Sequence, residues 1–410
     1  MRPSVVNLGS KCKMPVRILH ICEPFDPGGT AWWLIDVAKV LPRDEYSLEF
    51  ACWGNDIGRR GEEVQALGCR VSAVPPSLGE VMGGRALRQL IHAGQYDIVH
   101  CHMFNLSGWL LRHARTEGVI GRIAHFHATN DGRRLSLGTL LRRTVGRSLV
   151  RKHANALLAC SKAALASAPR LRGSFANEVI ACGIETGRYK AQTRSPGLRR
   201  SLGVPDDAAV VGHIGRFVSA KNHKGLIEIL KLLRGQLPNA FLVLVGDGPL
   251  RRAIERKVVS SGLSAHVRFL GARTDVERIL PAFDVFCLPS QYEGLGIAVL
   301  EARMAGIPVV ASAIPAIEEA LVGCNGSTLV EPGNHRKFAT TLASYLNDER
   351  RISPSEGWAS QFSRENSANQ LARFYTKVLR ATRSSKRSTA VTGAASIRTT
   401  PRPQVQKLVD

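Results

Sequence analysis

The segment from Ala282 to Ser312 constrains the fold more than any other part of this chain. It begins with AFDVFCLP, an apolar run typical of a buried parallel strand, and ends with a second such run, IPVVAS. Between them lie a glycine-rich junction and an apolar helix face that begins near Ile297. Strand, helix and strand in this order predict a βαβ unit, because two parallel strands need a crossover connection.

Two carboxylates in this segment are candidate ligand-binding groups. Glu293 lies at the carboxyl end of the first strand, and the sequence GLG at 294–296 follows it, where bare backbone can approach a ligand. Glu301 lies eight residues after Glu293, inside the predicted helix. The helix N-terminus suits a phosphate and the carboxylates suit hydroxyl protons, so together they can hold a polyhydroxylated anion. The pair alone fits a surface turn and a solvated helix residue equally well.

Length and composition allow two domains of ordinary size. The chain has 410 residues, of which 44% are hydrophobic, enough for substantial cores. We find no apolar run long enough to span a bilayer and no signal pattern at the start, which favours a cytosolic protein. The nine cysteines are scattered singly without a C-x-x-C pair, which argues for reduced thiols and against a cysteine zinc site.

The charge balance predicts an anionic partner. Lys and Arg total 56 against 33 Asp and Glu, a net charge of +23. From Arg133 to Lys152 the chain has seven basic residues and no acid, with leucine and valine at helical spacing. This pattern predicts a basic amphipathic helix that can lie on an anionic membrane surface. An ordinary helix docked on its own core through the leucines explains it equally well.

The first half of the chain alternates strand and helix patterns. Its first strand, VRILHIC, leads into a turn with Gly28 and Gly29 and then into a helix. This arrangement presents backbone amides to a phosphate or a phosphorylated sugar, although a lone glycine pair is more often only a turn. The alternation predicts an α/β fold with a doubly wound parallel sheet over residues 16–185, after a loose N-terminus at 1–15.

Two strand ends in this half carry histidine pairs. YDIVHCHM contains His100 and His102, and RIAHFHAT contains His125 and His127. No H-E-x-x-H motif or third type of ligand accompanies them, so we expect no metal site. His127 is the candidate hydrogen-bond donor at a cleft rim, whereas His100 and His125 fit buried core positions better.

After a polar linker at 186–196, the alternation starts again over residues 197–361. The strand AVVGHIGRF delivers Gly215 and Arg216 at its end, and Lys221 follows before the next helix. Two cations between a strand end and a helix start can clamp a diphosphate from two sides. In so basic a chain they also fit a solvated loop.

The end of the chain is predicted to be a helix over 362–380, which can pack back on the first domain, and a tail over 381–410. The segment from Arg380 has seven basic residues and one acid among Ser, Thr, Ala and Pro. This composition predicts disorder. The tail either helps a membrane or polyanion contact or only solubilises the protein.

With these motifs in order, the second domain resembles the donor half of glycosyltransferase family 4, a group of GT-B enzymes that use nucleotide sugars. GRFVSAKNHKGLIEIL, VGDGPLRRAIE, VRFLGARTDV and EGLGIAVLEARMAGIPVVAS follow that family's order, and Glu293 and Glu301 match its E-x7-E signature. The first domain resembles the acceptor half more loosely, through ILHICEPFDPGGT, YDIVHCHM, RIAHFHAT and ACSKAA, as in members that build bacterial surface polysaccharides. The resemblance implies two Rossmann-like domains that face each other across a cleft.

The resemblance also implies a reaction, the transfer of a sugar from a nucleoside diphosphate, UDP before others, to a glycan or lipid-linked acceptor with retention. The catalytic residues that it implies are His127 by the reacting sugar, Glu293 on the sugar hydroxyls, and Arg216 and Lys221 on the diphosphate. The donor-binding residues that it implies are Gly28, Gly29, Gly215, Arg216, Lys221, Gly246, Arg273, Glu293, Gly294, Leu295, Gly296, Ile297, Ala298 and Glu301. No D-x-D motif is present, so we expect neither a metal nor another cofactor.

Other functions remain open at this point. A nucleotide-sugar epimerase of the same fold is one alternative, and a noncatalytic relative that binds polyanions or membranes is another. A nucleic-acid-binding protein is disfavoured, because no zinc finger, RNP-like strand or basic heptad region is found. Two departures from the family pattern, ACGIE at 181–185 and Pro315-Ala316, affect the hinge and a loop. We expect a cytoplasmic enzyme, peripheral at the inner membrane face if the basic helix binds lipid.

Overall fold

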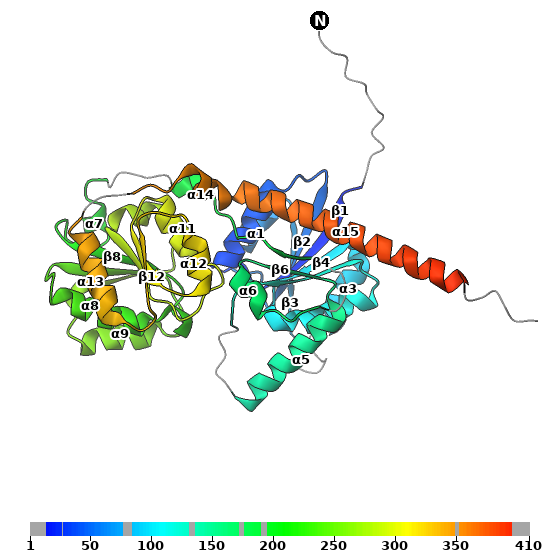
Figure 1. The fold of residues 1–410 in the computed structure, drawn as a ribbon, viewed down its shortest axis with the longest axis horizontal. Coiled ribbons are helices and arrows are strands. Elements are labelled where there is room, and N and C mark those ends of the chain that lie inside the picture. The colour runs from blue at the N-terminus through cyan, green and yellow to red at the C-terminus, as the bar shows by residue number, and fades with distance from the viewer. Residues whose placement is uncertain are drawn as a thin grey trace, which may run out of the picture.

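The computed structural model describes residues 14–26, 28–76, 84–130, 136–171, 176–189, 195–348 and 352–395, with side chains as far as residue 382. Two α/β domains lie side by side, each built on a parallel sheet with helices on both faces (Figure 1). The predicted fold of two doubly wound domains is therefore confirmed.

The N-terminal domain contains a seven-stranded sheet in the order β3-β2-β1-β4-β5-β6-β7. Every pairing is parallel, and buried apolar side chains fill the strands, as expected for a sheet covered on both faces. The strands are β1 Val16–Cys22, β2 Tyr46–Trp53, β3 Arg70–Val74, β4 Ile98–Cys101, β5 Gly121–Phe126, β6 Ala156–Ala159 and β7 Asn177–Val179, and the helices are α1 Gly29–Val40, α2 Gly61–Ala66, α3 Gly84–Gly94, α4 Ser107–Thr116, α5 Leu137–His153 and α6 Lys162–Ser167.

The C-terminal domain contains a six-stranded parallel sheet in the order β10-β9-β8-β11-β12-β13. The predicted βαβ unit is β11, α11 and β12, with Phe286 paired to Val309. The strands are β8 Ala209–Ile214, β9 Ala240–Val245, β10 Val267–Gly271, β11 Val285–Leu288, β12 Val309–Ser312 and β13 Ser327–Val330, and the helices are α7 Leu198–Ser201, α8 His223–Arg234, α9 Arg251–Ser260, α10 Val276–Ile279, α11 Ile297–Met304, α12 Pro315–Leu321, α13 His335–Leu346 and α14 Glu356–Gln361.

Each sheet has a point where the strand order reverses, between β1 and β4 in the first domain and between β8 and β11 in the second. The connections leaving two such strands run to opposite faces of the sheet and leave a crevice between them. The segments that follow β1, β4, β8 and β11 carry Gly28, His102, Arg216 and Glu293. The topology therefore places most of the predicted site residues where this fold binds ligands.

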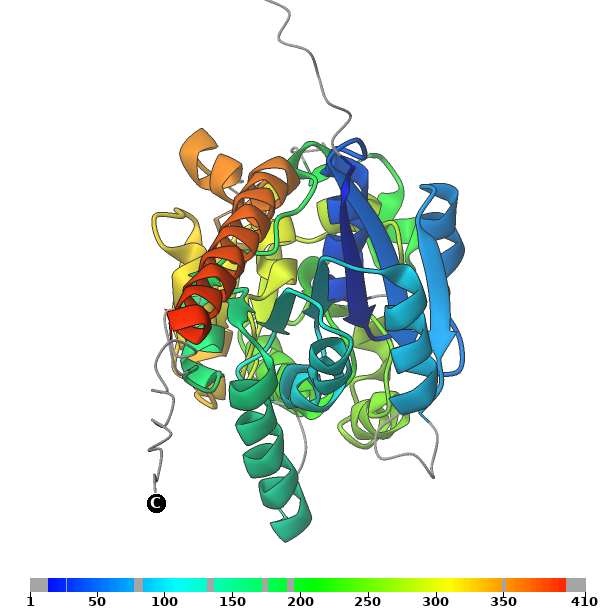
Figure 2. The same cartoon turned by 90° about the vertical axis from the view of Figure 1, so that its right-hand side faces the viewer.

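The last helix, α15 (Arg364–Ala395), crosses from the C-terminal domain back to the N-terminal domain, where it packs along α1 (Figures 1 and 2). The indole nitrogen of Trp33 donates to the hydroxyl of Ser367 over 2.8 Å, and the Tyr375 hydroxyl lies 2.8 Å from Nδ1 of His100. Both contacts are buried. Through these contacts α15, which follows the C-terminal domain in sequence, becomes part of the N-terminal domain's packing.

The helix is longer than the sequence predicts. The predicted end is residue 380, with a disordered tail after it, but helical structure continues to Ala395. The added residues include Gly393, Ser and Thr, which favour a helix less than Ala does, but the first proline after them is Pro401, so no residue of this stretch breaks the helix. The rest of the predicted tail lies outside the described residues.

Other boundaries also differ from the predictions. The last strand of the first domain, β7, ends at Val179, and Ile184 forms a single bridge to Ser363. The predicted linker begins with a 3₁₀ helix, η2 (Thr186–Tyr189), and residues 190–194 lie outside the described part, as does 1–13 of the N-terminus.

The basic helix predicted over Arg133–Lys152 is α5, which begins at Leu137 and extends away from the body of the protein (Figure 2). Its buried residues are Gly146, Val150 and His153, which excludes docking through the leucines of its first two turns. Leu137, Leu140 and Leu141 are 88%, 54% and 65% exposed. Among the described residues, no helix is long and apolar enough to cross a membrane.

Candidate active site

A cleft of about 1860 Å³ separates the carboxyl edges of the two sheets. It is lined by residues from both domains, including every residue that the sequence analysis placed in the site. These are Gly28, Gly29 and His127 from the first domain, and Gly215, Arg216, Lys221, Gly246, Arg273, Glu293, Gly294, Leu295, Gly296, Ile297, Ala298 and Glu301 from the second. The fold thus gathers segments from both halves of the chain into one cavity; the roles assigned to them stay predictions.

Glu293 and Lys221 form an ion pair at the centre of the donor side. The Lys221 ammonium lies 2.6 Å from Oε1 of Glu293, and the Ser290 hydroxyl donates to the same oxygen over 2.7 Å. Lys221 ends the short helix η3 (Ser219–Lys221), while Glu293 follows β11, the neighbouring strand of β8. Both groups are mostly buried, so each charge is balanced by the other when no anion is bound.

Glu301 lies deeper, on α11, and is 8% exposed. The Tyr189 hydroxyl from η2 donates to its Oε1 over 2.8 Å. Burial raises the pKa of Glu301 to about 7, and the hydrogen bond from Tyr189 acts in the opposite direction. The carboxyl group is therefore divided between its neutral and ionised forms near neutral pH.

The remaining charged groups of the donor side are more open. Arg216 follows β8 and is exposed in the cleft, with no ion-pair partner within the described ranges. Arg273 follows β10 and is paired with Asp275 over 2.7 Å. The first amides of α11 also face the cleft beyond Gly296, whose φ of 82° is the left-handed conformation that glycine tolerates. Arg216 and the first amides of α11 thus leave positive charge on this side of the cleft that no described acid neutralises.

The glycine-rich segment after Glu293 is where the two domains touch. A Cβ on Gly294 would lie 1.8 Å from the carbonyl oxygen of His127. The Thr129 hydroxyl donates to the carbonyl of Glu293 over 3.1 Å, and the Ser161 hydroxyl donates to that of Gly294 over 2.5 Å. The sequence predicts that the bare backbone of Gly294 serves a ligand; the structure adds that it lets the two edges of the cleft meet.

The opposite edge carries the glycine pair that precedes α1. Gly28 has an extended backbone, and a Cβ there would make only an ordinary contact, 3.9 Å from the carbonyl oxygen of Asp26, so no steric reason demands a glycine. A Cβ on Gly29 would lie 2.7 Å from the tip of Ile297, on the facing helix. The indole of Trp32, next along α1, is stacked by the Arg60 guanidinium at 3.3 Å from its centroid. The absence of a side chain at Gly29 therefore lets this edge approach Ile297 of the other domain closely.

Behind the glycine pair lies a cluster of five histidines, which we call the histidine cluster: His20, His100, His102, His125 and His127. Neighbouring imidazole nitrogens lie 2.9 to 3.1 Å apart, and two groups of three ligand atoms fall within 4.8 Å of one another. The sequence predicts two separate pairs and cannot give the distance between them. His127 alone of the five is only partly buried, and it faces the cleft.

The sequence analysis missed several residues of the site. Tyr189 lies in a segment treated as a linker, and Ser290 precedes the glutamate that it binds. His20 sits inside an apolar strand, where a single histidine gives no signal. Its hydrogen-bond partners are His102, which follows β4, and Tyr375 of α15, so only the strand order and the return of α15 bring it into the cluster.

Comparisons with known proteins agree with this architecture. Residues 27–188 match the model of Glycosyltransferase Family 4, and residues 195–358 match that of Glycosyl transferases group 1. The chain is 28% identical to the putative glycosyltransferase EpsF of Bacillus subtilis, over 72% of this chain and 79% of EpsF. It is 33% identical to the lipopolysaccharide core biosynthesis glycosyltransferase LpsE of Rhizobium meliloti, over 44% of this chain and 52% of LpsE.

Among solved structures, the fold is similar to that of HepE from Anabaena in complex with UDP and glucose. The TM-score is 0.74 at 24% identity, and the match covers 88% of this chain and 99% of HepE. At this identity the similarity concerns the fold.

Proposed function

Because this chain is a glycosyltransferase, built from a Glycosyltransferase Family 4 domain followed by a Glycosyl transferases group 1 domain, we propose that it transfers a sugar from a UDP-sugar to a glycan or lipid-linked acceptor during surface polysaccharide synthesis. The name of LpsE supports the class of pathway, and the complex of HepE with UDP and glucose supports the donor.

One observation carries the proposal: Arg216, Lys221, Glu293 and Glu301 line the same cleft as His127, across the domain boundary. A noncatalytic relative has no need of this convergence. An epimerase keeps its sugar on the nucleotide, whereas a cleft of about 1860 Å³ with walls from two domains has room for a donor and an acceptor together.

We assign the diphosphate to Lys221 and Arg216. A donor diphosphate competes with Glu293 for the Lys221 ammonium, and the first amides of α11 add the positive end of a helix dipole. When Lys221 turns to the phosphate, Oε1 of Glu293 loses the hydrogen bond from the ammonium and keeps the one from the Ser290 hydroxyl. The carboxylate can then accept a hydrogen bond from a sugar hydroxyl in place of Lys221. Glu301 accepts hydrogen bonds from the ribose, in the place now taken by Tyr189.

During transfer the bond between the sugar C1 and the β-phosphate oxygen breaks, and its electron pair stays on the diphosphate. The acceptor hydroxyl oxygen bonds to C1, and its proton passes to the departing diphosphate. Negative charge grows on the leaving group and positive charge on the sugar ring, so the preorganised cations Lys221 and Arg216 stabilise the transition state. Attack on the face that the diphosphate leaves gives retention of configuration.

Calorimetric titration of the protein with a panel of nucleotide sugars tests the donor assignment. We expect one UDP-sugar to bind and to be hydrolysed slowly without acceptor, and Lys221→Ala to weaken both. Lys224→Ala is the matched control, since Lys224 is exposed in the first turn of the next helix, α8, and has no ion pair among the described residues. If no nucleotide sugar binds, the proposed function is wrong.

A second proposal concerns the membrane, where a lipid-linked acceptor would be held. We propose that α5 lies on an anionic membrane, because Leu137, Leu140 and Leu141 are exposed on a helix that also carries Arg142 and Arg151. Co-sedimentation with anionic vesicles at low salt tests this directly. We expect binding by the wild type and its loss in Leu140→Gln/Leu141→Gln; a protein that stays in the supernatant refutes it.

A further inference from the structure

The histidine cluster lies on one face of the N-terminal sheet, where β1, β4 and β5 are neighbours. His20 pairs in register with His100, and alternate residues of a strand share a face. Two hydrogen-bonded ring pairs are nearly coplanar, at 9° for His20 and His102 and 13° for His100 and His125. Coplanar rings with nitrogens at 3.0 and 3.1 Å have the geometry of N–H···N hydrogen bonds.

These contacts join into a single series that passes through the C-terminal helix. From the cleft inward, the partners are Cys182, His127, His102, His20, Tyr375, His100 and His125. The successive distances between their nitrogen, oxygen and sulfur atoms are 3.7, 2.9, 3.0, 3.5, 2.8 and 3.1 Å. In every ring Nδ1 faces the preceding member of the series, which is the Cys182 sulfur for His127, the Tyr375 hydroxyl for His100 and an Nε2 for the other three rings.

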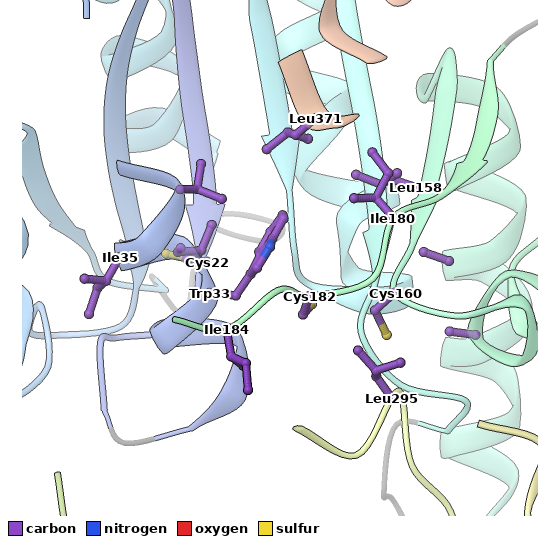
Figure 3. Packing of buried hydrophobic residues seen from close by; sticks show 14 of the residues in the cluster. Cys22, Trp33, Ile35, Leu158, Cys160, Ile180, Cys182, Ile184, Leu295 and Leu371 are labelled. Atoms are coloured by element: carbon purple, nitrogen blue, oxygen red, sulfur yellow. The ribbon is translucent and has the colours of Figure 1, made fainter. Parts of the chain in front are cut away.

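Apolar packing shields the inner part of the series from water. Trp33 lies against His102, His125 and His127, and its own N–H is used by Ser367. Figure 3 shows Trp33 with Leu371 of α15 to one side and the segment that carries Cys182 to the other. Burial lowers the pKa of His20 and His127 to about 3 and that of the other three rings well below its usual value, so every ring carries one proton at neutral pH.

If every ring carries one proton and every contact of the series is a hydrogen bond, the protons can be placed on the ring nitrogens in only two ways. The Tyr375 hydroxyl has a single hydrogen, so its bonds force the rings on both sides to take the same direction. Either every Nε2 carries the proton, or every Nδ1 does. The first arrangement ends in an N–H at Nε2 of His125, which is buried without a hydrogen-bond partner among the described residues. The second ends there in a lone pair.

An unpartnered buried N–H is rarer and more costly than an unpartnered acceptor. The second arrangement also directs the Nδ1 proton of His127 toward the cleft, where the Cys182 sulfur, at 3.7 Å, is only a weak acceptor. We propose that the histidine cluster and Tyr375 form one directional hydrogen-bond chain that holds His127 as a neutral Nδ1–H donor to an oxygen of the bound substrate. This inference rests on the proposed function only for the identity of that oxygen.

The chain also explains why a metal is not needed to account for the cluster. A metal would require three lone pairs to converge on one point. In the proposed arrangement the lone pairs of His20 and His102 face a neighbouring hydroxyl or N–H, and that of His127 accepts from His102. His102 and Tyr375 are then positioning residues that act through His127.

Long-range proton–nitrogen correlation spectra of protein with isotope-labelled histidine test the chain without any substrate. We expect all five rings to be neutral with the proton on Nδ1. In Tyr375→Phe, His100 and His125 should become a mixture of tautomers, because the Nδ1–H and the Nε2–H arrangements of this pair then each leave one N–H and one lone pair without a partner. His127 should keep its Nδ1 proton. An Nε2–H form of His127 in the wild type would refute the proposal, as would stoichiometric Zn²⁺ binding that shifts these signals.

A pair of variants at His102 tests the effect on catalysis. His102→Leu removes the donor to Nε2 of His127 and should lower donor hydrolysis about 10-fold, the size of one hydrogen bond. His102→Asn restores an N–H at that place and should stay within about 3-fold of wild type. Equal losses in both variants, at equal melting temperatures, would show that His102 has only a structural role. If the spectra agree but no nucleotide sugar is hydrolysed, the chain stands and the proposed function falls.

Discussion

At the cleft, strands β4 and β5 of the N-terminal sheet lead into the neutral imidazoles of His102 and His127, whereas the C-terminal sheet leads into lysine, arginine and glutamate side chains. Both sheets have the same topology around their switch points, so the fold does not dictate this difference. A nucleoside diphosphate needs charge where it binds. Beside Glu293, which we assign to the sugar hydroxyls, the reacting centre needs a hydrogen-bond donor that brings no competing charge. The difference is therefore what we expect if the charged edge holds the leaving group and the histidine edge supplies a neutral donor to the sugar.

Removing charge from the C-terminal edge should have the largest effect. Lys221→Ala takes away the cation beside Glu293 and should lower the rate of donor hydrolysis by about 100-fold or more, because transition-state charge loses a preorganised partner. Stopped assays on the best donor measure this. If Lys221→Ala and Lys224→Ala are equally active, the charged edge does not stabilise the leaving group.

The contact between the edges should be next in importance. In Gly294→Ala the new Cβ would meet the His127 carbonyl oxygen at 1.8 Å, so the two edges must separate. A displacement of this size in a reacting geometry should lower kcat/KM by on the order of 10-fold to 100-fold. Gly357→Ala is the control, because nothing lies near its Cβ position. If Gly294→Ala and Gly357→Ala had equal kcat/KM values, the close approach of Gly294 to the His127 carbonyl would not matter for catalysis.

The packing of α15 supports the neutral edge and should affect stability more than binding. Ser367→Ala leaves the Trp33 N–H buried without its acceptor and should lower the free energy of unfolding by about 1–3 kcal/mol. Denaturant unfolding measures this, with Ser344→Ala, an exposed serine, as control. If Ser367→Ala changed the free energy of UDP-sugar binding more than the free energy of unfolding, α15 would act on donor binding and not mainly on stability.

Glu301 is the one group of the charged edge that is as buried as the histidines, and it should show the smallest effect. Its pKa of about 7 lies above the ordinary value because of burial, so its ionised fraction grows as pH rises through that value. An ionised carboxylate makes stronger hydrogen bonds with ribose hydroxyls, so affinity for a UDP-sugar should rise about fivefold across that range. In Glu301→Gln the affinity should be flat with pH. A wild-type profile without slope would show that Glu301 does not contact the ribose.

The charged edge was largely predictable from the sequence, because its residues follow strands within the C-terminal domain. Glu293 and Glu301 share one βαβ unit, and Arg216 and Lys221 flank one strand–helix junction. The neutral edge was only partly predictable. His20, Tyr375 and Tyr189 come from a core strand, the terminal helix and the linker, and their contacts depend on strand order and on how α15 returns. Local patterns carry no information on such distances.

The helix ends show the same limit. Nothing in the residues after Arg380 distinguishes a continuing helix from a tail, since the composition suits both. Likewise, the leucines of α5 follow a helical period, but the period alone could not tell that the face with Gly146 and Val150 would be the buried one.

A crystal structure of the protein with a 2-fluoro UDP-sugar, which reacts slowly because fluorine disfavours positive charge on the ring, would test the opposition of the two edges most directly. We expect the diphosphate on Lys221 and Arg216, the sugar between Glu293 and His127, and an Nδ1–H···O hydrogen bond from His127 to the sugar or the leaving oxygen. A diphosphate bound away from Lys221, or a sugar that points away from His127, would contradict this account.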